Sequence, residues 1–204
     1  MKEFNSSGEL IIQDGTITQP GSPVNKSYVD NLISLDTYKG TGSPEGKVTA
    51  PVGSIYTDSA ATNGAVRWIK MSGEGNTGWR IDSGDTGWRE LTPINGWAGG
   101  LYIRRINDTV YYRGKINATN ATNGNAWDIP LGFRVGTLLS TQGQGYDYGR
   151  SSVTTDENDP KVRNVSFYFS RFTISGYSTA HVYSIDVSYP TSNDWPSTLP
   201  GTPA

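Results

Sequence analysis

The chain has 204 residues, a formal net charge of −2 and an apolar share of only 34 %, yet it carries 6 Trp, 12 Tyr and 5 Phe. The lack of cysteine excludes disulfides, thiolate nucleophiles and zinc ribbons, and the nearly neutral charge argues against a nucleic-acid partner. Apolar runs such as Leu10–Ile12 are far shorter than the ~20 residues of a membrane span, so no membrane partner is expected. Many aromatics with little other apolar surface indicate a folded chain with a thin core, which oligomerisation can stabilise.

The first 36 residues contain two elements. Residues 1–23 hold one short predicted strand, 9–12, followed by a turn at Asp14–Gly15. Residues 24–36 show the only convincing helical pattern, with Asn25 as a possible N-cap. An apolar stripe follows helical spacing and consists of Tyr28, Val29, Leu32, Ile33 and Leu35. A helix this short needs a partner for that stripe, either copies of itself in a trimer or the β domain of its own chain.

Residues 37–91 are predicted to form a thin β connector. Short β-like runs cover 53–58 and 65–70, separated by a turn at Asn63–Gly64. A local repeat then places the tripeptide Thr-Gly-Trp, followed by Arg, at 77–80 and again at 86–89. Each copy reads as a turn that leads into a strand with Trp and Arg on opposite faces. We expect Trp to stack on Arg from a neighbouring strand or chain.

Residues 92–204 are predicted to form an antiparallel β-sandwich, jelly-roll-like in layout. Predicted strands recur at short intervals and cover 101–106, 109–116, 127–130, 165–174 and 180–189. In the last of these, polar and apolar side chains alternate from Val182 to Tyr189, as in a half-buried strand. The proline-rich residues after Tyr189 predict an extended tail that runs across a surface, with Trp195 as its anchor.

Three segments resemble parts of phage tail-fibre and receptor-binding proteins. Residues 25–32 (NKSYVDNL) are similar to an element near fibre N-termini that begins a trimeric coiled coil. Residues 42–58 (GSPEGKVTAPVGSIYTD), with Trp68 and Trp79, are similar to a module of minor tail proteins in phages of Gram-positive bacteria, Actinobacteria above all. Residues 101–116 (LYIRRINDTVYYRGKI) and 129–134 (IPLGFR) resemble the start of a fibre head. Two departures are Gly136, where that loop usually has proline, and residues 137–163, which match no part of the family.

A saccharide site would need aromatic and hydrogen-bonding side chains on a rigid scaffold. The segment that best fits is a glycine-rich loop whose candidate ligand-binding residues are Gln142, Gln144, Tyr146, Asp147, Tyr148 and Arg150. The alternative is that the two tyrosines point inward from an ordinary strand and Arg150 is simply solvated. Trp127 is expected in the core or at a subunit interface.

The sequence offers little catalytic chemistry, so the chain is not expected to be an enzyme or to bind a cofactor. A Ser-His-Asp triad would need the single histidine, His181, which is expected to be an ordinary strand residue, hydrogen-bonded or facing solvent. A carboxylate pair for glycoside hydrolysis cannot be recognised from sequence, because the separation of the pair is three-dimensional. No calcium loop is present, and no metal site is predicted beyond weak binding at the acidic run 155–159.

The resemblance therefore implies a homotrimeric virion appendage, on the tail or elsewhere on the outside of the particle. Its N-terminal segment would attach to other virion proteins, and its head would recognise saccharide of the host cell wall without cleaving it. A different class of function is a structural head-fibre, collar or decoration protein that binds only other virion proteins. A polysaccharide hydrolase is the third reading.

Overall fold

The computed structural model describes residues 3–4, 10–11, 37–135, 150–154, 160–168 and 170–204. In these residues the protein is mainly β with several antiparallel sheets, and none of them forms a helix, so no helix among them could cross a membrane. The strands preceding residue 92 are β1 (Glu3–Phe4), β2 (Leu10–Ile11), β3 (Thr37–Gly40), β4 (Ile55–Asp58), β5 (Ala65–Lys70), β6 (Trp79–Gly84) and β7 (Arg89–Leu91). Those that follow are β8 (Ala98–Ile106), β9 (Thr109–Asn117), β10 (Asn125–Asp128), β11 (Arg150–Thr154), β12 (Pro160–Tyr168), β13 (Arg171–Ile174), β14 (Val182–Pro190) and β15 (Thr202–Pro203).

The strands form three sheets. A four-stranded sheet has the order β3-β4-β5-β6, in which β3 runs parallel to β4 and the other pairs are antiparallel. A nine-stranded antiparallel sheet has the order β10-β13-β12-β11-β14-β9-β8-β7-β15, and β1 pairs with β2. Strand β7 pairs with β8, so this last part of the 37–91 segment joins the larger sheet.

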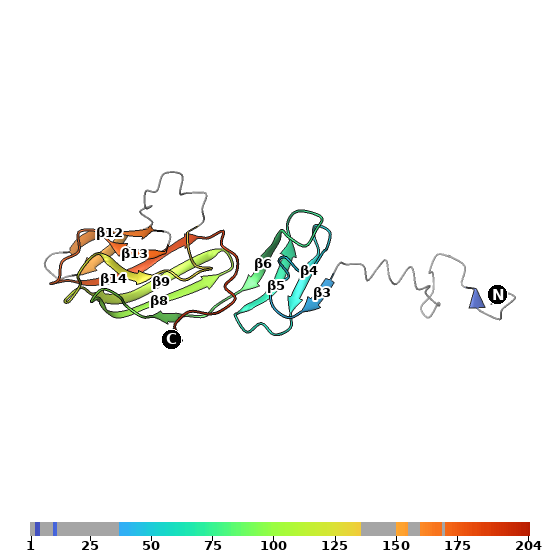
Figure 1. Cartoon of the computed structure of the whole chain (residues 1–204), viewed down its shortest axis with the longest axis horizontal. Helices are drawn as coiled ribbons and strands as arrows, with labels where there is room; N and C mark the ends of the chain where they lie inside the picture. The colour runs from blue at the N-terminus through green and yellow to red at the C-terminus, as the bar shows by residue number, and fades with distance from the viewer. Residues whose placement is uncertain (1–2, 5–9, 12–36, 136–149, 155–159, 169) are drawn as a thin grey trace.

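The nine-stranded sheet folds over so that its two ends face each other. Strand β12 makes this possible, because its first half pairs with β11 and its second half pairs with β13. Figure 1 shows β12 and β13 above β14, β9 and β8. Buried side chains from both layers meet in one core, among them Leu101, Ile103, Tyr112, Trp127, Phe167, Phe172, Tyr183 and Tyr189. Trp127 is fully buried there and donates its indole N–H to the carbonyl of Leu91 at 3.0 Å, which confirms the expected core position.

Strand β14 confirms the predicted alternation. Tyr183, Ile185, Val187 and Tyr189 are buried, whereas the residues between them are exposed or half-buried. The predicted single strand over 165–174 is wrong. That segment is a hairpin of β12 and β13, with Phe167 opposite Phe172, because only a reversal of the chain brings both rings into the same core.

His181 departs from its expected position. It lies just before β14 rather than inside the strand, and its Nδ1 is buried without a hydrogen-bond partner among the described residues. Its backbone N–H donates to the carbonyl of Ser178, and its ring lies 6.3 Å from that of Tyr183. No carboxylate of the described residues hydrogen-bonds to its ring, so these residues do not form a Ser-His-Asp triad with it.

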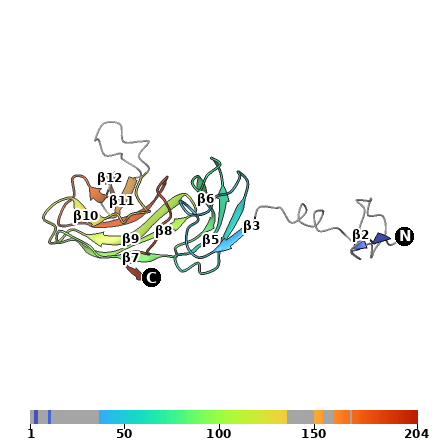
Figure 2. The same cartoon turned by 45° about the vertical axis from the view of Figure 1, so that its right-hand side comes forward.

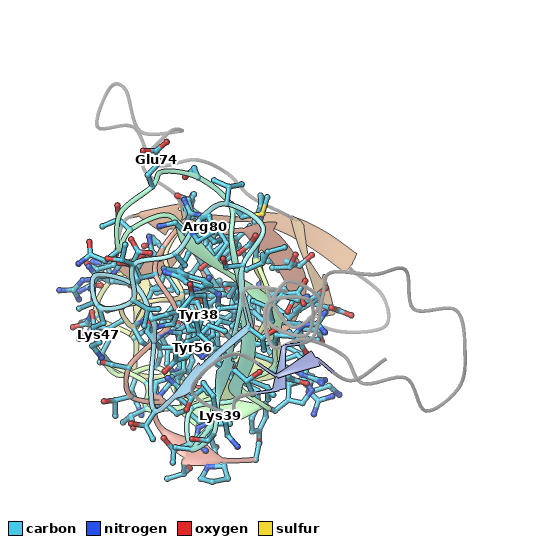
Figure 3. All side chains as sticks on the ribbon, turned by 90° about the vertical axis from the view of Figure 1, so that its right-hand side faces the viewer. Tyr38, Lys39, Lys47, Tyr56, Glu74 and Arg80 are labelled. Carbon is cyan, nitrogen blue, oxygen red and sulfur yellow. The ribbon has the colours of Figure 1, made fainter. Side chains whose placement is uncertain are left out.

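The four-stranded sheet has a small core of its own. Tyr38 and Tyr56 lie side by side on β3 and β4 (Figure 3), and both rings meet Trp79 edge-on at about 6 Å. Lys70 is buried beside them and donates its ammonium to the carbonyls of Gly75, at 2.5 Å, and Thr77. These contacts hold the loop after β5, where Glu74 lies at the rim in Figure 3. The sheet contributes only a few large apolar side chains to this core, among them Trp68, Trp79 and Ile81, and Trp195 from the C-terminal tail completes it.

The C-terminal tail contacts both sheets, and Figure 2 shows the C-terminus beside β7 of the larger sheet. Trp195 is 7 % exposed, packs on the four-stranded sheet and donates its indole N–H to the carbonyl of Asn63 at 3.0 Å. The tail then returns to the larger sheet as β15, where Arg89 donates to the carbonyls of Pro200 and Gly201. The predicted anchoring role of Trp195 is confirmed.

Candidate recognition surface

One face of the nine-stranded sheet carries half-buried aromatic rings among charged side chains. On β8 and β9, the residues that point away from the core are Tyr102, Arg104, Tyr111, Arg113 and Lys115. Strand β14 extends the same face with Ser184, Asp186 and Ser188. We call this face, together with Trp88, the recognition surface.

The strand register arranges these side chains in rows across the sheet. In one row Glu90, Tyr102, Arg113 and Asp186 lie opposite one another on four consecutive strands. In the next row, Arg104 lies opposite Tyr111, which lies opposite Ser188. Directly opposite side chains in an antiparallel sheet are ~4.5–5.5 Å apart at Cβ, so each ring has a charged or hydroxyl neighbour.

Trp88 lies at the edge of this surface, just before β7. The Arg113 guanidinium lies over its ring at 4.1 Å, and the Arg104 guanidinium lies at 5.9 Å. Both arginines come from neighbouring strands, which confirms the predicted stacking of Trp on Arg for this copy of the repeat. Such cation–π contacts hold exposed arginines in fixed positions, which lowers the entropy cost of binding.

An ion pair orients Arg104. Its Nε donates to Oδ1 of Asp85 at 2.8 Å, and its Nη2 donates to Oδ2, so the pair is bidentate. Asp85 Oδ1 also accepts from the backbone N–H of Gly87 at 2.8 Å. The hydrogen bond from Arg104 holds the pKa of Asp85 below its usual range, outweighing the opposite effect of burial. The same pair raises the pKa of Arg104.

This ion pair predicts a pH-dependent contribution to stability. Because the pKa of Asp85 is lowered in the folded chain, the contribution is complete above the usual carboxyl pKa of about 4 and is lost as the pH falls through the lowered value. The difference in unfolding free energy between the wild type and Asp85→Asn should shrink between pH ~6 and pH ~2, by less than about 1 kcal/mol because the pair is partly exposed. Urea titrations at several pH values measure it, and a constant difference would contradict it.

A second concave region lies between the 130–132 loop and the tail residues 192–200. This groove has a volume of about 860 Å³, and Leu131 stands on its rim with 72 % of its surface exposed. Its one aromatic residue, Trp195, is almost fully buried against the four-stranded sheet and offers no ring face to a ligand. The groove is therefore a weaker candidate for saccharide stacking than the recognition surface.

Most of the site residues predicted from sequence are not among the described residues. Gln142, Gln144, Tyr146, Asp147 and Tyr148 lie outside the described residues, as do the helix 24–36 and its stripe and the acidic run 155–159. Arg150 begins β11 and pairs with Asn164. Among the described residues, no group of three or more His, Cys, Asp or Glu side chains could hold a metal ion.

The recognition surface itself was missed in the sequence. The available signal was the alternation in 101–116, which places Tyr102, Arg104, Tyr111 and Arg113 on the face opposite Leu101, Ile103 and Tyr112. No family model, curated protein sequence or solved structure matches this chain. Its function is therefore inferred from the chemistry of its own residues and from the resemblance of its motifs.

Proposed function

We propose that the protein is a non-enzymatic virion appendage, a tail fibre or receptor-binding protein, that recognises carbohydrate on the host cell surface. The observation that carries this proposal is the recognition surface, where Tyr102, Tyr111 and Trp88 lie among fixed hydrogen-bonding groups on a rigid sheet. Saccharides are bound by such combinations, since the apolar face of a sugar ring packs on an aromatic ring while its hydroxyls exchange hydrogen bonds with side chains. The sequence motifs that resemble phage fibres support the same conclusion.

The parts of the chain are assigned to the parts of such an appendage. The folded-over nine-stranded sheet would be a jelly-roll-like β-sandwich head, the four-stranded sheet its connector, and residues 24–36 a short coiled-coil helix in a homotrimer. The small core of the four-stranded sheet is consistent with this proposal, because small domains often gain stability by assembly. Residues 1–23 would then attach the trimer to other virion proteins.

A structural protein of the head, collar or capsid surface is the second candidate. The recognition surface favours it in one respect: the described residues form a flat array across adjacent strands rather than a pocket, and flat faces rich in Tyr, Trp and Arg are typical of protein interfaces. In that case the partner would be another virion protein.

Replacing Arg113 by alanine tests the proposal. The change removes a charged group from the centre of the surface and the contact that holds the ring of Trp88 in place, so we expect binding to host cells or to their wall polysaccharide to weaken about tenfold or more. Lys39→Ala is the matched control, since Lys39 is an exposed cation on β3 of the other sheet and should bind like wild type. Binding is measured on a glycan array and on intact Gram-positive cells with the full-length chain, whose mass in light scattering checks for a trimer.

Three results separate the candidates. Loss of binding in Arg113→Ala but not in Lys39→Ala supports carbohydrate recognition at this surface. A wild-type chain that binds no envelope component but captures purified virion proteins supports the structural role. Release of reducing sugar from the polysaccharide would contradict both and indicate a hydrolase.

A further inference from the structure

Three asparagines of the described chain precede glycine: Asn63, Asn95 and Asn123. In such a pair the glycine nitrogen can attack the side-chain amide carbon, because glycine has no Cβ to hinder the approach. The bond from the glycine nitrogen to Cγ forms, the bond from Cγ to Nδ2 breaks, and ammonia leaves with the displaced proton. Water then opens the cyclic imide to aspartate or isoaspartate, without any oxidant or reductant.

Asn63 and Asn123 begin with the same local geometry. Asn63 Oδ1 accepts from the backbone N–H of Ala65 at 3.3 Å, and Asn123 Oδ1 accepts from that of Asn125 at 2.9 Å. This Asx turn places the side-chain amide next to the peptide nitrogen of the following glycine. Both asparagines are therefore near the reactive arrangement, and what differs is how the reacting atoms are held.

At Asn63 both the leaving group and the nucleophile are engaged. Its Nδ2 donates to the carbonyl of Pro196 at 2.8 Å, and the N–H of Gly64 donates to the carbonyl of Ala61 at 3.1 Å. The backbone carbonyl of Asn63 also accepts from the indole of Trp195. The docked tail thus fixes the asparagine in place, and the reaction requires local opening.

Asn123 shares one of these restraints, since its backbone carbonyl accepts from the indole of Trp97 at 2.8 Å, but not the two on the reacting groups. The side chain is exposed, and within the part of the chain that the structure describes neither its Nδ2 nor the N–H of Gly124 donates a hydrogen bond. Asn95 is intermediate, because its Nδ2 donates to the carbonyl of Asn125 at 2.9 Å.

We propose that Asn123 is a site of spontaneous deamidation in the folded protein and that the docked tail protects Asn63. The product carries a new carboxylate two residues before β10 begins. The isoaspartate form also adds a methylene to the backbone beside the Asn123 carbonyl, which accepts from the indole of Trp97 at 2.8 Å. That indole packs against Trp127 and Tyr183, so the modification acts at the margin of the larger core.

The test is incubation of the full-length chain at mildly alkaline pH, with peptide mass spectrometry at successive times. We expect the peptide with Asn123 to deamidate at least about tenfold faster than the peptide with Asn63. A local opening at Asn63 that costs about 1.4 kcal/mol is enough to slow the reaction there tenfold. The same chain unfolded in urea is the control, and there the three rates should become similar. Equal rates in the folded chain, or Asn63 as the first to react, would overturn the proposal.

Trp195→Ala adds a second comparison. Loss of the tail contact should accelerate deamidation at Asn63 while the rate at Asn123 stays unchanged. An unchanged Asn63 rate would show that the tail does not protect it and would overturn that half of the proposal. Should the variant unfold, all three rates would approach those in urea, and the wild-type comparison of Asn63 with Asn123 still decides the assignment of Asn123.

Discussion

Replacing Arg105 by methionine is expected to destabilise the folded chain by about 3–5 kcal/mol, the range for removing one partner of a buried charged network. Arg105 is 2 % exposed and occupies an inward position of β8. Its guanidinium donates to four backbone carbonyls at 2.5–3.0 Å, those of Asn107, Gly132, Asn193 and Asp194. Methionine fills similar space but leaves these carbonyls without their donor, and that of Gly132 is in a buried position.

Charge alone does not explain the role of Arg105. Burial lowers its pKa to about 10, and it remains a cation at neutral pH. Its nearest carboxylate is that of Asp108, 3.7 Å away and largely exposed, so the ion pair contributes little. The guanidinium also lies over the ring of Trp195 at 4.9 Å. Arg105 therefore holds the tail through directed hydrogen bonds, and lysine, with fewer donors in a different geometry, should restore only part of the stability.

Arg104→Met is the matched control for the Arg105 prediction. It removes the same type of side chain from the next residue, but from the outward face, where the ion pair with Asp85 is partly exposed. Arg104→Met should lower the free energy of unfolding by less than about 1 kcal/mol. Urea denaturation of both variants gives the comparison, and equal costs for the two would show that the buried network is not what stabilises the fold.

Trp195→Ala should lower the free energy of unfolding by about 3–5 kcal/mol. The loss of stability should be concentrated in the four-stranded sheet. The indole supplies one of the few large side chains in that core, and Gly84 leaves room for it, since a Cβ there would lie 2.8 Å from the indole ring. Amide hydrogen exchange measures how the loss of stability is distributed between the two sheets. Amides of β4 and β5 should lose protection, whereas those of β8 and β9 should keep most of theirs.

Two comparisons sharpen the Trp195 prediction. Trp88→Ala removes a half-buried indole from the outer surface and should cost about 1 kcal/mol, the typical value for a point substitution. The double variant with Arg105→Met should be less destabilised than the sum of the two single variants, because both substitutions release the same tail segment. Equal loss of hydrogen-exchange protection in the two sheets of Trp195→Ala would contradict the prediction that Trp195 mainly stabilises the four-stranded sheet.

Sequence patterns predicted the features that depend on local alternation. The inward residues of β14 follow the two-residue period, and Trp127 is in the core. The reversal between β12 and β13 was missed because the residues between Tyr168 and Arg171 contain no Gly, Asn, Asp or Pro, and Ser170 is only a weak turn signal. The buried position of Arg105 was missed because an arginine at an inward position of β8 interrupts the alternation of apolar and polar residues from which burial is predicted.

The recognition surface depends on information that no local pattern contains. Arg113 meets Asp186 and Tyr102 only because β9 lies between β14 and β8 in the sheet. Strand order of this kind is set by packing of the whole core, in which segments far apart in the chain must share one layer. The outward residues could be predicted strand by strand, but their assembly into rows could not.

The docking of the tail has a consequence for synthesis on the ribosome. Trp195 follows Asn63 by 132 residues, so β3–β6 are made long before the indole that completes their core exists. Domains generally fold as the chain emerges, N-terminal parts first. Here the four-stranded sheet has to wait until Trp195 has left the ribosome, which happens after the strands of the larger sheet up to β14 have been made. A ribosome stalled before Trp195 emerges would therefore carry a nascent chain whose four-stranded sheet is still open to proteases and chaperones.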